Sequence, residues 1–102
     1  MIITINDDAA AWYENEMDLS SGSYLRFFVR YGGFSSIQKG FSLGVSKEEP
    51  DHIGVKTEKN GVTYYIEEKD IWYFDGHDMY VELHPVGQEP DFKFENRVGG
   101  GD

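Results

Sequence analysis

The stretch Arg26–Val45, which reads RFFVRYGGFSSIQKGFSLGV, decides the fold of this protein. Side chains alternate between two faces over residues 25–31 and again over residues 41–46, which predicts two strands. Between these strands, the Gly32–Gly40 segment contains two adjacent glycines, an apolar ring at Phe34 and two serines. Because loops often present binding residues from a rigid scaffold, this segment is the first candidate for a functional surface.

The N-terminal residues predict a short strand and the main helix. Residues 2–5 are rich in isoleucine and indicate the strand. Asn6 or Asp7 is expected to cap a helix that continues to about Met17. Acidic side chains in its first turn favour the helix because they face the positive end of its dipole.

A hairpin and a short helical turn are predicted in the second half of the chain. Asn60-Gly61 separates the runs VKTEK and VTYYIEE, and this dipeptide is a strong hairpin signal. Asp70 is expected to cap a helical turn formed by IWYF, which Gly76 ends in a left-handed conformation. Two further strands, MYVEL and DFKFE, are predicted after that turn.

Together these elements predict an α+β, mostly β fold, with a curved, mainly antiparallel sheet, one main N-terminal helix and a short helical turn. A length of 102 residues fits one domain, which we place at residues 1–97. Residues 98–102 are expected to form a flexible C-terminal tail. No apolar run is long enough to span a membrane, and the opening residues MIITINDD lack the pattern of a signal peptide.

Charge and cysteine content exclude several classes of function. Acidic residues outnumber basic ones by 19 to 9, for a formal net charge of −10. A field of this sign repels phosphates, which excludes nucleic acids and anionic membrane surfaces as partners. The sequence has no cysteine, so disulfides, thiolate metal sites and thiol nucleophiles are absent. Since small extracellular domains usually need disulfides, a cytoplasmic location is expected.

Two groups of polar side chains could carry chemistry. Asp75, His77 and Asp78 bring oxygen and imidazole ligands together in a short segment that could attract a divalent cation, although Asp75-Gly76 is also a turn signature. Ser35 and Ser36 follow two glycines but lie in no nucleophile elbow, and turn serines that bond their own backbone explain them. The sequence therefore predicts no catalytic residue.

A third group points to binding. Arg26, Phe28 and Arg30 share one face of a predicted strand in a chain with few cations. They are a candidate docking patch for an acidic partner, and the alternative is ordinary cross-strand pairing with Asp and Glu side chains.

The stretch quoted first resembles a segment of HesB-like (A-type iron–sulfur carrier) proteins that reads, in outline, R-V-x-V-x-x-G-G-C-S-G-F-x-Y-x-F-x-L. Gly32, Gly33 and Ser35 match that pattern, and Phe34 stands where the family has its first cluster-binding cysteine. The segments NGVTYYIEEKDIWYFDGHDMYVE and DFKFEN resemble later blocks of the family pattern. Where the family then has C-G-C, this sequence has residues 98–101, VGGG.

This resemblance implies a HesB-like fold and membership of the iron–sulfur cluster assembly family. Members hold iron or a cluster through thiolates, because soft sulfur suits iron clusters. A phenylalanine ring cannot ligate iron, so the resemblance implies a non-enzymatic member without a cluster cofactor. We expect an accessory role through contact with another protein, as a monomer or homodimer.

The expected contact surface combines the vacant ligand position and its loop with the neighbouring strand face. Its residues are Gly32, Gly33, Phe34, Ser35 and Ser36 of the loop, together with Arg26, Phe28 and Arg30. The alternative function is binding of iron or another divalent cation through Asp75, His77 and Asp78.

Overall fold

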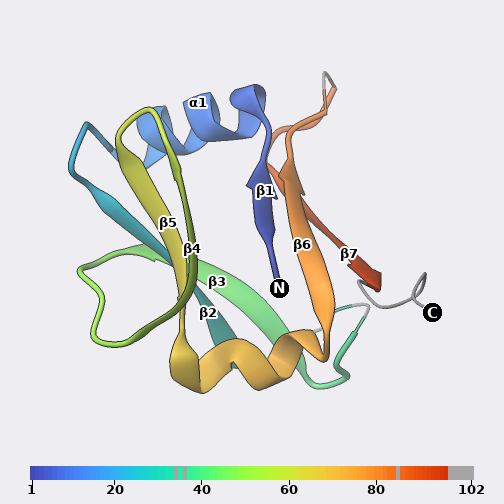
Figure 1. The fold of residues 1–102 in the computed structure, drawn as a ribbon. Coiled ribbons are helices and arrows are strands. Elements are labelled where there is room, and N and C mark those ends of the chain that lie inside the picture. Colours follow the sequence, from blue (N-terminus) through green and yellow to red (C-terminus); the bar gives the residue numbers. More distant parts are fainter. Residues whose placement is uncertain (34, 36, 85, 97–102) are drawn as a thin grey trace.

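A computed structural model of the protein describes residues 1–33, 35, 37–84 and 86–96 (Figure 1). Seven strands and two helices follow one another along this part of the chain. In order they are β1 (Ile3–Ile5), α1 (Asp7–Glu16), β2 (Tyr24–Tyr31), β3 (Phe41–Lys47), β4 (Ile53–Lys59), β5 (Val62–Glu67), the 3-10 helix η1 (Glu68–Phe74), β6 (His77–Glu82) and β7 (Asp91–Asn96). Phe34, Ser36 and the expected tail at residues 98–102 lie outside the described residues.

The strands form two sheets. One has the order β3-β2-β5-β4 and the other the order β1-β6-β7. The α+β, mostly β class and the mainly antiparallel pairing are confirmed, but each sheet also contains one parallel pair, β2 with β5 and β1 with β6. The division into two sheets was not predicted. It occurs where β5 runs into η1, which carries the chain across to β6 (Figure 1).

The hydrophobic core lies between the two sheets. Figure 1 shows α1 across one end of the molecule and η1 at the other. Phe27 of β2 is fully buried, and its ring lies 5.7 Å from that of Phe92 of β7. This ring contact connects the two sheets. Ala9, Ala10 and Tyr13 are the buried residues of α1. Small residues beside one large ring let this helix pack closely, and such burial drives folding.

The predicted helix and hairpin are confirmed in detail. Asn6 caps α1 by accepting a 2.8 Å hydrogen bond from the backbone N–H of Ala9. Asn60 and Gly61 join β4 to β5 with φ angles of 56° and 81°. Two successive left-handed residues are what a two-residue hairpin turn requires, so the local sequence determines this turn.

The role predicted for Asp70 is wrong. The residue before η1 is Glu67, whose side chain makes no cap hydrogen bond, and η1 starts earlier than expected, at Glu68. Asp70 therefore lies inside the helix, where its carboxylate is directed to β2. At the other end, Asp75 has the left-handed conformation with φ 47°, and Gly76 follows with φ 80°.

Among the residues that the structure describes, no helix is long and apolar enough to cross a membrane.

Candidate functional site

The loop between β2 and β3 is closed at its base. The backbone N–H of Gly32 donates a 2.6 Å hydrogen bond to the carbonyl of Gly40, and both residues have positive φ. Gly33 is also left-handed, and a Cβ there would lie 2.7 Å from the Ser42 hydroxyl oxygen. Backbone conformation thus favours glycine at both adjacent positions, and close approach to Ser42 adds a second reason at Gly33.

Polar contacts also attach this loop to η1. The hydroxyl of Ser35 accepts a hydrogen bond from the N–H of Gln38 at 3.1 Å and lies 3.2 Å from its carbonyl oxygen. The side-chain amide of Gln38 donates to the carbonyl of Tyr73 at 3.3 Å. Ser35 is therefore a turn serine that stabilises the loop, as its sequence context indicated.

Aromatic rings continue from this end of the hairpin onto η1. Tyr31 is 92% exposed, and its ring lies 5.7 Å from that of Phe41. The Phe41 ring lies in turn 5.3 Å from that of Trp72, which is 52% exposed. Large rings rarely gather on the surface of a monomer, so this aromatic tip (Tyr31, Phe41 and Trp72) is one candidate contact surface.

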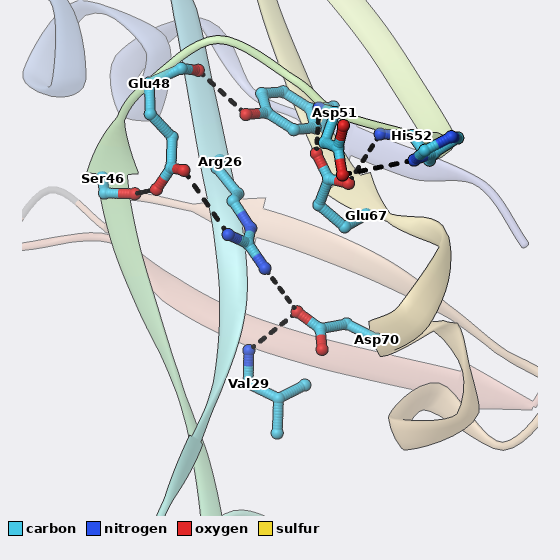
Figure 2. Close-up of polar contacts among 9 residues, drawn as sticks. Arg26, Val29, Ser46, Glu48, Asp51, His52, Glu67 and Asp70 are labelled. Carbon is cyan, nitrogen blue, oxygen red and sulfur yellow. Dashed lines mark hydrogen bonds and ion pairs between the residues drawn. The ribbon is translucent and has the colours of Figure 1, made fainter.

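Within the predicted patch of Arg26, Phe28 and Arg30, the structure pairs Arg26 with carboxylates and keeps it against Phe28. Arg26 forms ion pairs with Asp70 at 3.2 Å and with Glu48 at 3.5 Å (Figure 2). Its guanidinium also lies over the ring of Phe28. Only 16% of its side chain is exposed, so Arg26 is largely engaged in contacts within the molecule.

Asp70 gives this ion pair its structural importance. The carboxylate oxygen that pairs with Arg26 also accepts a 3.3 Å hydrogen bond from the backbone N–H of Val29 (Figure 2). The pairing of β5 with β2 extends only to Arg26 of β2. Beyond that point Asp70, and not β5, binds the backbone along this edge of β2. It thereby holds η1, and the loop that η1 supports, against the sheet.

Glu67, at the end of β5, fixes the preceding connection in the same way. Its two carboxylate oxygens each accept a 2.8 Å hydrogen bond, from the backbone N–H groups of Asp51 and His52 (Figure 2). Burial opposes ionisation, but these two donors hold the pKa of Glu67 below its ordinary value. The carboxylate thus organises the turn before β4 and is not placed as an acid or base for catalysis.

Phe28 and Arg30 instead border a groove of about 350 Å³ beside β3. One wall is formed by Phe28, Arg30 and Gly44, and the other by Trp12, Pro90 and Phe92. No local sequence pattern predicts this groove, because its lining residues come from segments far apart in the chain. Gly44, in the middle of an alternating strand, was the one local hint, since an interior strand glycine often marks a close approach.

The residues proposed as cation ligands have partners of other kinds. The Nδ1 atom of His77 lies 2.9 Å from the carbonyl oxygen of Phe74, and Asp78 accepts a hydrogen bond from the N–H of Ile2 at 2.7 Å. His77 and Asp78 are neighbours on β6, so their side chains point to opposite faces. Within the described residues there is no group of three or more His, Asp or Glu side chains placed to hold a metal ion.

Comparison with solved structures identifies the fold. The crystal structure of Escherichia coli SufA, which is involved in the biosynthesis of iron–sulfur clusters, aligns with a TM-score of 0.56 at 22% sequence identity. The alignment covers 93% of this chain and 80% of that chain. At this identity the likeness shows a common fold.

Sequence comparison identifies relatives and the family. A Bacillus subtilis (strain 168) protein named pyruvate dehydrogenase inhibitor is 54% identical over 95 residues, which cover 93% of this chain and all of that protein. An uncharacterized Staphylococcus saprophyticus protein is 37% identical over 87 residues, covering 82% of this chain and 89% of the relative. Residues 1–99 match the family described as iron-sulphur cluster biosynthesis. The chain therefore belongs to the iron–sulphur cluster biosynthesis family, in which it is a divergent, cysteine-free member.

Proposed function

We propose that this protein is a non-enzymatic regulator that binds pyruvate dehydrogenase in the cytoplasm and inhibits it. One observation carries the proposal: the similarity to the Bacillus subtilis pyruvate dehydrogenase inhibitor extends over the whole of that relative at 54% identity. At that level of identity, the surfaces of two small domains share many residues as well as their cores. An inhibitor that acts by contact also needs no cofactor.

The chemistry of the loop supports this proposal over cluster transfer. The loop keeps its closed base, its left-handed glycines and its attachment to η1. Phe34 stands in the sequence where the resemblance places a cysteine, and the chain has no cysteine elsewhere. Because iron–sulfur clusters are held by thiolates, the scaffold has kept its architecture without the ligands that cluster transfer requires.

Enzyme assays test the proposal directly. Purified pyruvate dehydrogenase complex of Bacillus subtilis is assayed for NADH production while this protein is added up to a tenfold molar excess over the complex. We expect saturable inhibition. Escherichia coli SufA, which shares the fold, is the matched control and should leave the rate unchanged. An unchanged rate with this protein, together with no binding by calorimetry, would refute the proposed function.

The role of iron is tested separately. We expect the protein to acquire no stoichiometric cluster after anaerobic reconstitution with iron and sulfide, and a chelator should leave its inhibition unchanged. Visible absorbance that scales with bound iron would contradict the inference from the missing thiolates.

A further inference from the structure

The outer edge of β3 has no strand beside it in the described part of the chain. β3 is the first strand in the order β3-β2-β5-β4, and its seven residues pair only with β2. An edge strand presents a row of backbone N–H and C=O groups that can pair with another strand. Proteins often blunt such edges with proline, bulges or inward charges, and β3 has only a lysine at its end, Lys47.

This edge is bordered by the groove described above. Phe28 and Arg30 form its rim on the outer face of the sheet, while Trp12, Pro90 and Phe92 form the opposite wall. The groove therefore offers apolar contact alongside unused backbone groups. This is the combination by which sheet edges bind extended peptides, with affinity from main-chain bonds and selectivity from side-chain contacts.

Gly44 gives the rim its shape. A Cβ atom on Gly44 would lie 2.6 Å from Cζ of Phe28 and 2.8 Å from Cδ of Arg30. Both side chains of β2 therefore extend across β3 at this glycine, toward its outer edge. The absence of a side chain at residue 44 lets an aromatic ring and a cation lie over β3, beside the edge at which an added strand would pair.

The segment that forms β2 and β3 has a charge opposite to that of the whole chain. Residues 19–47 contain four basic residues and no Asp or Glu, although the chain has a net charge of −10. Arg26 is paired with two carboxylates, and Lys47 donates to the carbonyl of Asp18 at 2.8 Å. Arg30 is exposed, and no ion pair to it is found among the residues that the structure describes. Glu89, a described residue that also lines the groove, forms no ion pair with Arg30 either.

We propose that the free edge of β3 binds an extended acidic segment of the target protein, which adds to the sheet as a further strand. Backbone groups of β3 pair with the segment, Arg30 binds one of its carboxylates, and its apolar side chains enter the groove beside Trp12. This inference rests on the proposed function and names the surface through which pyruvate dehydrogenase would be bound.

A second copy of this chain fits the edge less well. A symmetric pair of β3 strands centred on Gly44 would bring the two Arg30 side chains, and the two Phe28 rings, close to one another. Two guanidinium groups in that position repel each other, whereas an acidic segment neutralises one.

Matched variants distinguish this surface from the rest of the molecule. Arg30→Glu should weaken binding to the pyruvate dehydrogenase complex by about 10- to 100-fold, the range expected for a lost charge-assisted contact. Lys56→Glu is the control, since Lys56 is exposed on β4, the other edge of the same sheet, and the change in net charge is identical. We expect Lys56→Glu to bind within about twofold of wild type, as is usual for a residue outside a contact.

The two tryptophans provide a second comparison. Trp12→Ala should weaken binding about tenfold or more, as is typical of aromatic anchors at an interface, whereas Trp72→Ala should not. Circular dichroism and thermal melts check that each variant is folded. Loss of binding in Trp72→Ala with wild-type behaviour of Arg30→Glu and Trp12→Ala would overturn the proposal, because it would place the contact at the aromatic tip.

A defined peptide tests the edge even if pyruvate dehydrogenase is not the target. A capped octapeptide of alternating glutamate and valine is titrated into the wild-type protein, with its lysine–valine counterpart as control. We expect amide shifts centred on β3 and slower hydrogen exchange there with the acidic peptide only. Equal shifts with both peptides, or none at β3, would overturn the proposal, and light scattering must show that the complex contains one copy of this protein.

These arms separate the two claims. No inhibition by wild type, with the acidic peptide still bound at β3, would reject pyruvate dehydrogenase as the target and keep the edge as a binding site. Inhibition that is unaffected by Arg30→Glu and Trp12→Ala would keep the proposed function and reject the edge.

Discussion

Replacing Asp70 by asparagine should destabilise the protein by about 2 kcal/mol, in the range for hydrogen bonds to charged groups. Asp70 is the point at which η1 is attached to β2, through Arg26 and the backbone N–H of Val29. The side chains of Arg26 and Asp70 are only 16% and 12% exposed, so solvent screens this ion pair far less than a surface pair.

The magnitude follows from the geometry. At 3.2 Å, and with an effective dielectric constant of about 20, the attraction between the two charges is roughly 5 kcal/mol. Removing both groups from water offsets much of this, and Arg26 keeps Glu48 as a second partner at 3.5 Å. Asparagine retains an acceptor for Val29, so Asp70→Ala should cost more, about 3 kcal/mol.

Urea unfolding followed by tryptophan fluorescence and circular dichroism measures these changes. With a slope typical of a domain of this size, 2 kcal/mol moves the midpoint by about 1 M. Asp7→Asn is the control, because Asp7 lies in the first turn of α1 and pairs with Lys59 through a side chain that is 92% exposed, so its midpoint should fall far less than that of Asp70→Asn.

A double-mutant cycle decides whether the ion pair is responsible. Arg26→Gln and Asp70→Asn are measured singly and together, and we expect a coupling energy of at least about 1 kcal/mol. Additive effects, within about 0.4 kcal/mol, would refute the reasoning, because independent sites add in this way.

Three further changes test the packing and the electrostatics. The folded-state pKa of Glu67 is lowered, so its carboxylate stabilises the protein fully above the ordinary pKa of about 4.3. This stabilisation is lost as the pH falls through the folded-state pKa. Glu67→Gln should therefore lose more stability at pH 7 than at pH 3, measured by urea midpoints. Gly44→Ala should cost about 2 kcal/mol, since the new methyl group meets Phe28 and Arg30, and an unchanged melting temperature would contradict that steric account. Phe27→Ala should cost about 4 kcal/mol, because the ring is fully buried, and calorimetric unfolding checks whether the loss reaches the range of buried aromatic deletions.

Local features of the fold could be predicted because their causes are local. Asn6 caps a helix through a contact within a few residues, and Asn60-Gly61 supplies two left-handed residues in succession. The alternation over β2 and β3 places Leu25 and Phe27 in the core, as expected. The loop glycines were predicted as family features, and their left-handed backbone gives the physical reason for them.

The candidate site could be predicted only in part. Ser35 was expected to be a turn serine, and its contacts with Gln38 agree. The shared face of Arg26, Phe28 and Arg30 suggested one patch, yet pairing with Asp70 withdraws Arg26 from it. Asp70 lies 44 residues from Arg26 in the sequence, so no pattern in either segment indicates the pair.

The sequence by itself determined the helix, the hairpin turn, the alternating strands and the loss of every thiolate, because each depends on residue type or on neighbours a few positions away. Only the tertiary structure decided how the strands divide into two sheets, that Arg26 is paired while Arg30 of the same strand face forms no ion pair with a described residue, and where the free edge of β3 lies. Those features depend on contacts between distant segments, such as the parallel pairing of β1 with β6 and the contact of Asp70 in η1 with β2. Such contacts contribute free energy only in the folded chain, so a local sequence pattern does not indicate them.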